Sequence, residues 1–136
     1  MNDTGIEGGV VDNIANTEVL PSPIHGMGLF ATCWIPTGII LCNLDGQLVS
    51  WDKHCEKPRC SEWNSIEHEL LLTRPYQTKY FAINHSRSPN VDLDSKHPIS
   101  VLFTLVSIEK GQEILLDYRR QSLPESYVEG IGASYL

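Results

Sequence analysis

Polar and aromatic residues in three separate parts of the sequence have the types needed to hold a small ligand. Asn84 and His85 provide hydrogen-bond donors and acceptors beside an apolar stretch. The turn at 26–28 contains two glycines, and a backbone without Cβ atoms can approach a ligand closely. Tyr118 follows another apolar stretch. Each feature alone is also typical of an ordinary turn or a surface tyrosine, so their value depends on whether the fold brings them together.

Short strands are the elements that must position these residues. The clearest predicted strand is 101–107, which is rich in β-branched, aromatic and apolar residues. Further strands are predicted at 17–20, 47–50 and 114–116, each near a glycine or proline turn. No segment has a long helical period. The pattern therefore predicts a mostly-β fold.

One short pattern occurs twice. Residues 35–41 and 108–114 share the form I-x-x-G-x-x-[LI]. Each copy predicts a turn that leads into a strand, with glycine supplying a backbone angle that other residues rarely adopt. The match is too short to indicate a repeat architecture, but it predicts two similar strand–turn–strand units.

The middle of the chain is less regular. Residues 51–64 are polar and predict an irregular insert. For 66–73 two interpretations remain open. Asn64 and Glu67 are spaced to cap a helix, whereas the leucine run before Pro75 is typical of the end of a strand. The short length of this segment favours the strand.

The chain has 136 residues, which predicts one domain, and its 17 acidic against 10 basic residues give a formal charge of −7. Direct DNA or RNA binding is not expected, because nucleic-acid readers usually need a basic face. An acidic surface suits a basic partner such as a lysine-rich segment, although the charge is equally explained by solubility alone. No apolar run approaches the length of a membrane span and no signal pattern is present, so we expect an intracellular protein, with its compartment open.

The cysteines do not predict a disulfide framework in an intracellular chain. Cys55 and Cys60 lie close to His54, which raises the question of zinc. Their spacing is outside the usual range and no second pair follows, so no metal site is predicted. Cys33 and Cys42 are expected to be small buried hydrophobic residues.

Three segments, in the same order, resemble motifs of the SET-domain family of protein lysine methyltransferases. GMGLFA at 26–31 is similar to the family's GxG-[LV]-[FY]-[AS] turn, NHSRSPN at 84–90 to its NHSxxPN, and GQEILLDY at 111–118 to its GEE[IL]xxDY. A lone GxG is weak, but NHSxxPN is specific. The resemblance covers roughly 17–120.

This resemblance implies a β-clip-like fold of small curved β-sheets, in which the 84–90 and 111–118 segments form a C-terminal pseudoknot. It implies S-adenosylmethionine as the cofactor and a lysine of a basic protein or peptide as the substrate. The cofactor-binding residues that it implies are Gly26, Met27, Gly28, Asn84, His85 and Tyr118, with Tyr118 also as the catalytic tyrosine.

The sequence departs from the family's pattern in the expected substrate channel. Most members carry two further channel tyrosines, and Leu44 and Leu93 stand at those positions here. The channel is therefore expected to lack two hydroxyls that orient the lysine amine. Tyr76 or Tyr80, shortly before Asn84, is placed to compensate, and Tyr80 is the one assigned to the channel.

We predict a flexible arm at 1–16, a SET domain at 17–120 and a C-terminal segment at 121–136. That last segment contains no cysteine. It is expected either to fold back as an apolar lid through Tyr127 and Tyr135 or to remain a partly ordered tail. The predicted function is protein-lysine N-methylation. The alternatives are a degenerate SET domain that binds cofactor or peptide with little catalysis, and an unrelated small β domain. Monomer and homodimer remain open.

Overall fold

The computed structural model describes residues 10–56, 62–95 and 100–136. Its strands are β2 (Thr17–Pro21), β3 (Met27–Ala31), β4 (Ile40–Leu44), β5 (Gln47–Ser50), β6 (Glu62–Glu67), β7 (Leu70–Arg74), β8 (Asn84–His85), β9 (Val91–Asp94), β10 (Ser100–Thr104) and β11 (Leu115–Leu116). Its helical elements are α1 (Trp51–Glu56), α2 (Glu125–Glu129) and the 3₁₀ turns η1 (Lys79–Ala82), η2 (Tyr118–Arg120) and η3 (Ile131–Ser134). The mostly-β class is confirmed. In this described part, no helix has the length and hydropathy needed to cross a membrane.

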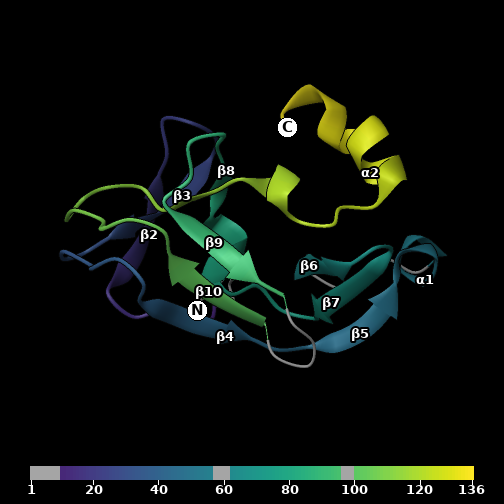
Figure 1. Ribbon diagram of the computed structural model, residues 1–136, viewed down its shortest axis with the longest axis horizontal. Helices are drawn as coiled ribbons and strands as arrows, with labels where there is room; N and C mark the ends of the chain where they lie inside the picture. Colours follow the sequence, from purple (N-terminus) through teal and green to yellow (C-terminus); the bar gives the residue numbers. More distant parts are fainter. Residues whose placement is uncertain (1–9, 57–61, 96–99) are drawn as a thin grey trace.

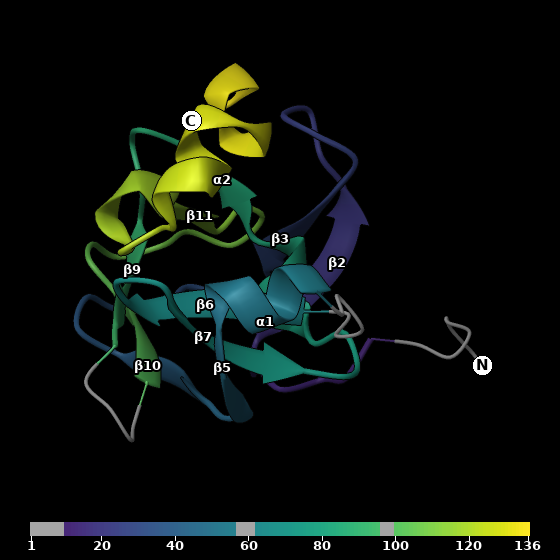
Figure 2. The ribbon, with the colours of Figure 1, turned by 90° about the vertical axis from the view of Figure 1, so that its right-hand side faces the viewer.

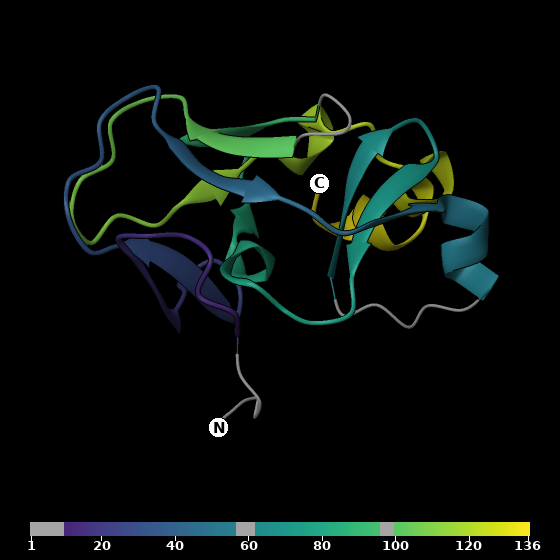
Figure 3. The same cartoon turned by 90° about the horizontal axis from the view of Figure 1, so that it is seen from below.

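The strands form three sheets (Figure 1). The largest has the strand order β4-β10-β9-β11-β8, and it lies between the β2–β3 hairpin and the sheet β5-β7-β6. The chain passes from the central sheet to the outer one where β4 leads into β5 (Figure 3). α1 follows β5 at the end of the molecule opposite β2 and β3. The two outer sheets are therefore held together through the central one.

A late strand of the chain crosses beneath an earlier loop. β11 pairs in parallel with β8 on one side and with β9 on the other, although only residues 86–90 join β8 to β9. The loop 86–90 must therefore pass over β11. Main-chain bonds close both of its ends, from Ser86 N to the Leu116 oxygen and from Asn90 N to the Leu115 oxygen, each at 3.0 Å. This crossing is the pseudoknot implied by the resemblance.

Apolar side chains of the central sheet and the β2–β3 hairpin share one core. Leu29, Leu102 and Ile114 have no exposed surface and belong to a single cluster of buried residues. On β10 the buried and partly buried positions alternate, as expected for a strand with one face on the core. Burying each such side chain stabilises the fold by roughly 1.5–3 kcal/mol relative to leaving it exposed.

The two copies of the repeated pattern pack against each other. Ile35 and Ile108 exchange main-chain hydrogen bonds, each N–H donating to the other's carbonyl at 2.8 Å. Gly38 and Gly111 have φ angles of 77° and 85°, in the region that favours glycine. The prediction of two glycine turns is confirmed, and the turns lie side by side because the isoleucines that precede them are paired.

Most predicted strands are confirmed. Those at 17–20, 47–50 and 114–116 correspond to β2, β5 and β11, and 101–107 corresponds to the shorter β10. The strand interpretation of 66–73 is confirmed in part, because β6 ends at Glu67, a turn follows at 68–69, and β7 begins at Leu70. The irregular insert was wrong for the described residues of 51–64, which form α1 and the start of β6. Polar side chains hid this strand, because its buried positions are hydrogen-bonded rather than apolar.

The flexible arm expected at 1–16 is not observed in its described part, residues 10–16. Ile14 is fully buried, and Val11 pairs with Thr78. The Lys79 ammonium donates to the carbonyl oxygens of Ile14 and Thr17 at 3.2 and 2.8 Å. One apolar anchor and one lysine therefore hold this segment against η1. Residues 1–9 lie outside the described range.

The cysteines occupy different environments. Cys42 is partly buried as expected, and burial raises the pKa of its thiol to about 11. Cys33 is exposed, against expectation, because it lies in the loop after β3 rather than on a strand. Cys55 is exposed on α1, and Cys60 lies outside the described residues. Within 10–56, 62–95 and 100–136, no group of three or more His, Cys, Asp and Glu is arranged to hold a metal ion.

A buried ion pair joins β6 to β7. Arg74 Nε lies 2.5 Å from Glu62 Oε2, and both side chains are 1% exposed. Glu62 also accepts hydrogen bonds from the main chain and the hydroxyl of Thr78, both at 2.7 Å. Arg74 donates to the Asp45 carbonyl at 2.8 Å and to Asn64 Oδ1 at 2.9 Å. Because both charges have several partners, removing one of them leaves the other buried and unpaired.

The substitution Arg74→Met is expected to lower the free energy of unfolding by about 3–5 kcal/mol, because it leaves the Glu62 carboxylate buried without its partner. Chemical denaturation measures this loss. Arg120→Met is the control, since Arg120 pairs with Asp92 at 2.9 Å but its side chain is 49% exposed. That variant should lose less than about 1 kcal/mol. Equal losses in the two variants would contradict the importance of the buried pair.

Candidate active site

One carboxylate closes the glycine turn at the start of β3. Glu113 accepts hydrogen bonds from Ser22 Oγ and Asn84 Nδ2, both at 2.9 Å. The same Asn84 amide donates to the carbonyl oxygens of His25 and Met27 at 3.1 Å. Three segments that are far apart in the sequence therefore meet at Glu113.

Gly28 is the position in this turn where a side chain does not fit. A Cβ there would lie 2.4 Å from Glu113 Oε2 and 3.0 Å from Ser22 Cβ. Gly26 differs, because its φ of 47° favours glycine while no atom would crowd a Cβ. The Met27 side chain is 51% exposed. Glycine is therefore favoured at 28 because the Glu113 carboxylate lies against the main chain, and at 26 because the main chain has a positive φ.

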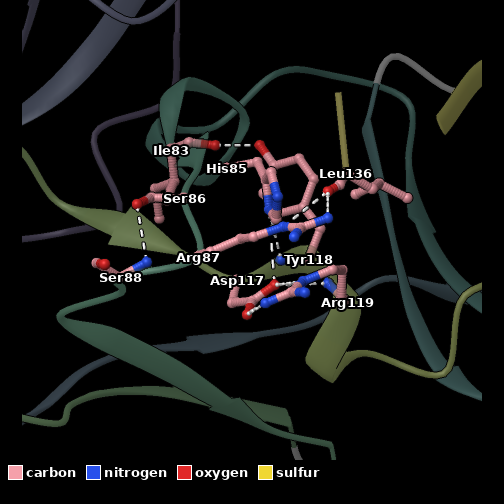
Figure 4. A network of polar contacts seen from close by, with 9 residues as sticks. All are labelled: Ile83, His85, Ser86, Arg87, Ser88, Asp117, Tyr118, Arg119 and Leu136. Carbon is pink, nitrogen blue, oxygen red and sulfur yellow. Dashed lines mark hydrogen bonds and ion pairs between the residues drawn. The ribbon is translucent and has the colours of Figure 1, made fainter. Parts of the chain in front are cut away.

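His85 and Tyr118 form one unit beside the crossing (Figure 4). The Tyr118 main-chain N–H donates to His85 Nδ1 at 3.0 Å, and the two ring centroids lie 5.1 Å apart. The Tyr118 hydroxyl donates to the Ile83 carbonyl oxygen. Because Nδ1 accepts a hydrogen bond, the proton of the neutral imidazole lies on Nε2. That Nε2 atom is buried near the Leu136 main chain, and no described residue makes a hydrogen bond of good geometry with it.

Burial controls the charge of this unit. It lowers the pKa of His85, and the nearby charge of Asp117 offsets part of that effect. It raises the pKa of Tyr118 and of Tyr80. Hydrogen bonds from Arg119 lower the pKa of Asp117. At neutral pH the imidazole and both phenols are therefore uncharged, and Asp117 is ionised.

His85, Tyr118 and Tyr80 line a cavity of about 810 Å³, a size usual for small-molecule sites. Ile24 and His25, which precede the glycine turn, form one wall together with the 80–85 segment, and β6 and the C-terminal segment form the other. The predicted cofactor residues Gly26, Met27 and Gly28 do not line this cavity. The lining residues are Ile24, His25, Glu62, Trp63, Asn64, Ser65, Tyr80, Phe81, Ile83, Asn84, His85, Tyr118, Gln121, Leu123, Tyr127, Ile131, Ser134 and Tyr135. The cavity joins the predicted cofactor residues Asn84 and His85 to the predicted catalytic Tyr118.

The C-terminal segment at 121–136 covers the cavity as a lid. In Figures 1 and 2 this segment, in yellow, lies above β6 and β7. Trp51 Nε1 donates to Ser126 Oγ at 2.7 Å, and Arg87 donates to the Leu136 oxygen at 2.8 and 3.1 Å. Of the two expectations for this segment, the structure has the lid.

The predicted channel residues lie in different places. Tyr80 lines the cavity, and within the described residues its hydroxyl makes no hydrogen bond. Leu44 and Leu93 are 3% and 8% exposed and belong to the hydrophobic core, not to the cavity wall. They lie outside the site because the pairing of β4 and β9 with β10 places these positions in the core around Leu102. Tyr76 is 44% exposed and also lies outside the cavity wall.

The profile of the SET-domain family matches residues 26–119, which is more than half of the chain. The chain belongs to the SET-domain family. No curated protein matches its sequence. The matched range of this SET domain begins at the glycine turn and ends beside Tyr118, so it includes both parts of the crossing. Most of the lid lies beyond the match.

Some residues of this SET-domain site were missed by sequence reasoning. Glu113 is part of the third motif, but its role in closing the glycine turn depends on contacts with Ser22 and Asn84 that no local pattern predicts. Trp63 lies in the segment interpreted as an irregular insert, yet it lines the cavity. An isolated tryptophan among polar residues was the one available signal.

Gly28→Ala is expected to destabilise this SET domain by about 1–3 kcal/mol, because the added methyl displaces the Glu113 carboxylate from its partners. Glu113→Ala removes the obstacle, so the double variant should lose less than the sum of the two single losses. Thermal or chemical denaturation of the four proteins measures this coupling. Additive losses would contradict the close contact.

NMR titration is expected to give His85 a pKa below 6.5, with the neutral ring protonated on Nε2. Asp117→Asn should lower this pKa further, because the Asp117 charge favours the imidazolium. The unfolded chain then binds the proton at higher pH than the folded one. His85 therefore costs stability as the pH falls below about 6.5. A rise of the His85 pKa in the Asp117 variant contradicts this account.

Proposed function

We propose that the protein is an S-adenosylmethionine-dependent protein-lysine N-methyltransferase. The observation that carries this proposal is the shared cavity, which connects the Asn84–His85 segment with Tyr118. The SET-domain match supports a methyltransferase role in general terms. The substrate proposed is a lysine on a basic protein or peptide.

The residues present fit such a cofactor. Asn84, His85 and Tyr118 line the cavity together, whereas the space beside Gly28 is taken by the Glu113 carboxylate. Within the described residues, the buried His85 Nε2 makes no hydrogen bond of good geometry, so it can donate to an acceptor of the ligand. The aromatic walls suit a sulfonium, because ring faces attract cations. When bound, S-adenosylmethionine supplies a methyl group that its sulfonium has already activated.

The chain itself would position the amine and keep the site dry. Tyr118 is held by its hydrogen bond to the Ile83 carbonyl, so its ring has a fixed place beside His85. Neutral aromatic walls disfavour the charged form of a lysine and lower its pKa, which makes the amine lone pair available. Alignment of the amine with the methyl group would supply much of the acceleration.

Charge supports the choice of a basic substrate. The chain has a formal charge of −7. A second hollow of about 530 Å³ beside the lid is lined by four carboxylates, from Asp52, Glu69, Glu125 and Glu129. Basic segments on either side of a substrate lysine would find complementary charge there.

A second candidate function is a SET domain that binds cofactor or peptide with little catalysis. Two observations favour it. Leu44 and Leu93 place no hydroxyl at the cavity, and the Tyr118 hydroxyl is already engaged by Ile83. In this case only Tyr80 offers a hydroxyl without a partner in the wall formed by 80–85.

Incubation with radiolabelled S-adenosylmethionine and a mixed pool of histone and lysate proteins should label a basic protein. Tyr118→Phe should lower kcat at least tenfold, roughly, while cofactor affinity changes little, because the hydroxyl anchors the ring rather than the cofactor. Tyr76→Phe, outside the cavity wall, is the matched control.

Two results would decide against this proposal. Equal labelling by Tyr118→Phe and the wild type would remove Tyr118 from catalysis. Calorimetry that detects binding of neither S-adenosylmethionine nor its demethylated product would reject the cofactor itself. Cofactor binding without any labelled protein supports the binding module instead.

A further inference from the structure

The lid at 121–136 packs against itself. Its elements α2 and η3 meet at Gly132, where a Cβ would lie 2.6 Å from Leu136 Cδ1 and 3.0 Å from the Tyr127 main-chain oxygen. The Leu136 main-chain N–H also donates to the Gly132 oxygen at 3.0 Å. Of the described residues after Tyr118, none belongs to the hydrophobic core cluster. The lid is therefore a small unit of its own, and the common core does not hold it in place.

Hydrogen bonds attach the first half of the lid to the body of the molecule. Ser65 Oγ, on β6, donates to the Ser122 oxygen. Trp51 Nε1, on α1, donates to Ser126 Oγ at 2.7 Å. These two bonds lie at the end of the lid that continues from η2, so they place a hinge there and leave the other end to a separate contact.

The far end of the lid meets Arg87. Its Nε and Nη2 both donate to the Leu136 oxygen, at 3.1 and 2.8 Å (Figure 4). The neighbouring Tyr135 ring has its centroid 6.2 Å from the centroids of both His85 and Tyr118. Two bonds from one guanidinium fix direction as well as distance, because the donors form a rigid fork. Arg87 therefore holds the end of the lid beside the unit of His85 and Tyr118.

Arg87 is well placed to act on the lid without disturbing the core. It belongs to the 86–90 loop, whose ends are closed by main-chain bonds to β11. Its side chain is exposed, and among the described residues the Leu136 oxygen is its hydrogen-bond acceptor. Exposed polar pairs are weak, so this contact can break while the loop beneath it stays in place.

We infer that Arg87 is a positioning residue, a latch that holds the lid closed and lets it open as one unit when Leu136 is released. The open lid would give ligands a route into the cavity between the lid and the body. That this ligand is S-adenosylmethionine rests on the proposed function, whereas the latch itself does not.

Such a latch controls rates and leaves affinity unchanged. Neither Arg87 nor Leu136 lines the cavity, so their contact does not touch a ligand inside it. Loss of the latch therefore destabilises the closed lid equally with and without ligand. Entry and exit of the ligand rise by the same factor, and the ratio of the two rates stays constant.

Native-state hydrogen exchange of the full chain, followed by NMR, tests the latch directly. In Arg87→Ala the hydrogen-bonded amides of Val128, Gly130 and Leu136 should exchange about fivefold faster. The Leu102 amide in the core should not change. Unchanged lid amides overturn the inference. Faster exchange at Leu136 alone also overturns it, because only the end of the chain would then fray.

Three further variants separate the latch from a general loss of charge or structure. Arg87→Lys keeps the charge without the fork and should give an intermediate rate. Arg120→Ala removes the same charge but loses a bond to Asp92 at 2.9 Å, outside the lid, so it should leave the lid amides unchanged. Ser126→Ala removes the bond from Trp51 and should speed the same amides together. Unequal changes along the lid in this last variant contradict opening as one unit, even if Arg87→Ala does not fold.

Stopped-flow fluorescence with S-adenosylmethionine measures the consequence for a ligand. Arg87→Ala should raise the association and dissociation rate constants by the same factor as the amide exchange, while Kd stays within about twofold. Unchanged rates, or weaker binding without faster entry, would show that the lid is no gate.

The latch and the proposed function fail in different ways. If S-adenosylmethionine does not bind, the proposed function fails, and hydrogen exchange still decides the latch. Normal methyl transfer with unchanged lid exchange in Arg87→Ala rejects the latch alone.

Discussion

The passage of β11 beneath the 86–90 loop is the constraint on which the rest of the structure depends. Asn90 holds β11 in this position. Its side chain accepts a hydrogen bond from the Leu115 main-chain N–H and donates one to the Glu113 main-chain carbonyl, both at 2.8 Å. Asn90 is 7% exposed, so water cannot readily replace these bonds. A shift of β11 by one residue would break both and turn its side chains to the other face. Tyr118 then would not meet His85, and Glu113 would not reach the glycine turn.

The ion pair of the β6–β7 hairpin has a consequence for ligands as well as for stability. Arg74 takes up the oxygens of Glu62 and Asn64, which are the strongest acceptors on that side of the cavity. With lysine or an acidic residue at position 74, a different set of the Glu62 and Asn64 oxygens would be left without a hydrogen bond. The hairpin is thus stabilised by contacts that also engage the Glu62 and Asn64 oxygens at the cavity wall and leave the buried Asn64 Nδ2 without a partner among the described residues.

Local patterns in the sequence predicted those parts of the fold that local chemistry determines. The β-branched, aromatic and apolar residues of 101–107 predicted β10, and the glycines at 38 and 111 predicted two turns with unusual backbone angles. That the 84–90 and 111–118 segments meet came from their resemblance to the SET-domain family and not from local chemistry. β6 could not be predicted in this way, because its polar residues are buried only when Arg74 arrives from β7. The placement of Leu44 and Leu93 in the core was equally hidden, since it depends on the twist of strands that the sequence does not describe.

The lid at 121–136 lies beyond the residues that match the SET-domain family. The match to the SET domain includes the crossing and Tyr118, which methyl transfer and simple cofactor binding would both require. Trp63 and residues after 119 form the other wall of the cavity. The hydrogen bond from Trp51 to Ser126 holds these later residues in place. Under the proposed function, the first part would hold the cofactor, and the second would set the shape and polarity that a substrate meets. Substitutions in the lid should therefore alter the choice of substrate before they alter the binding of the cofactor.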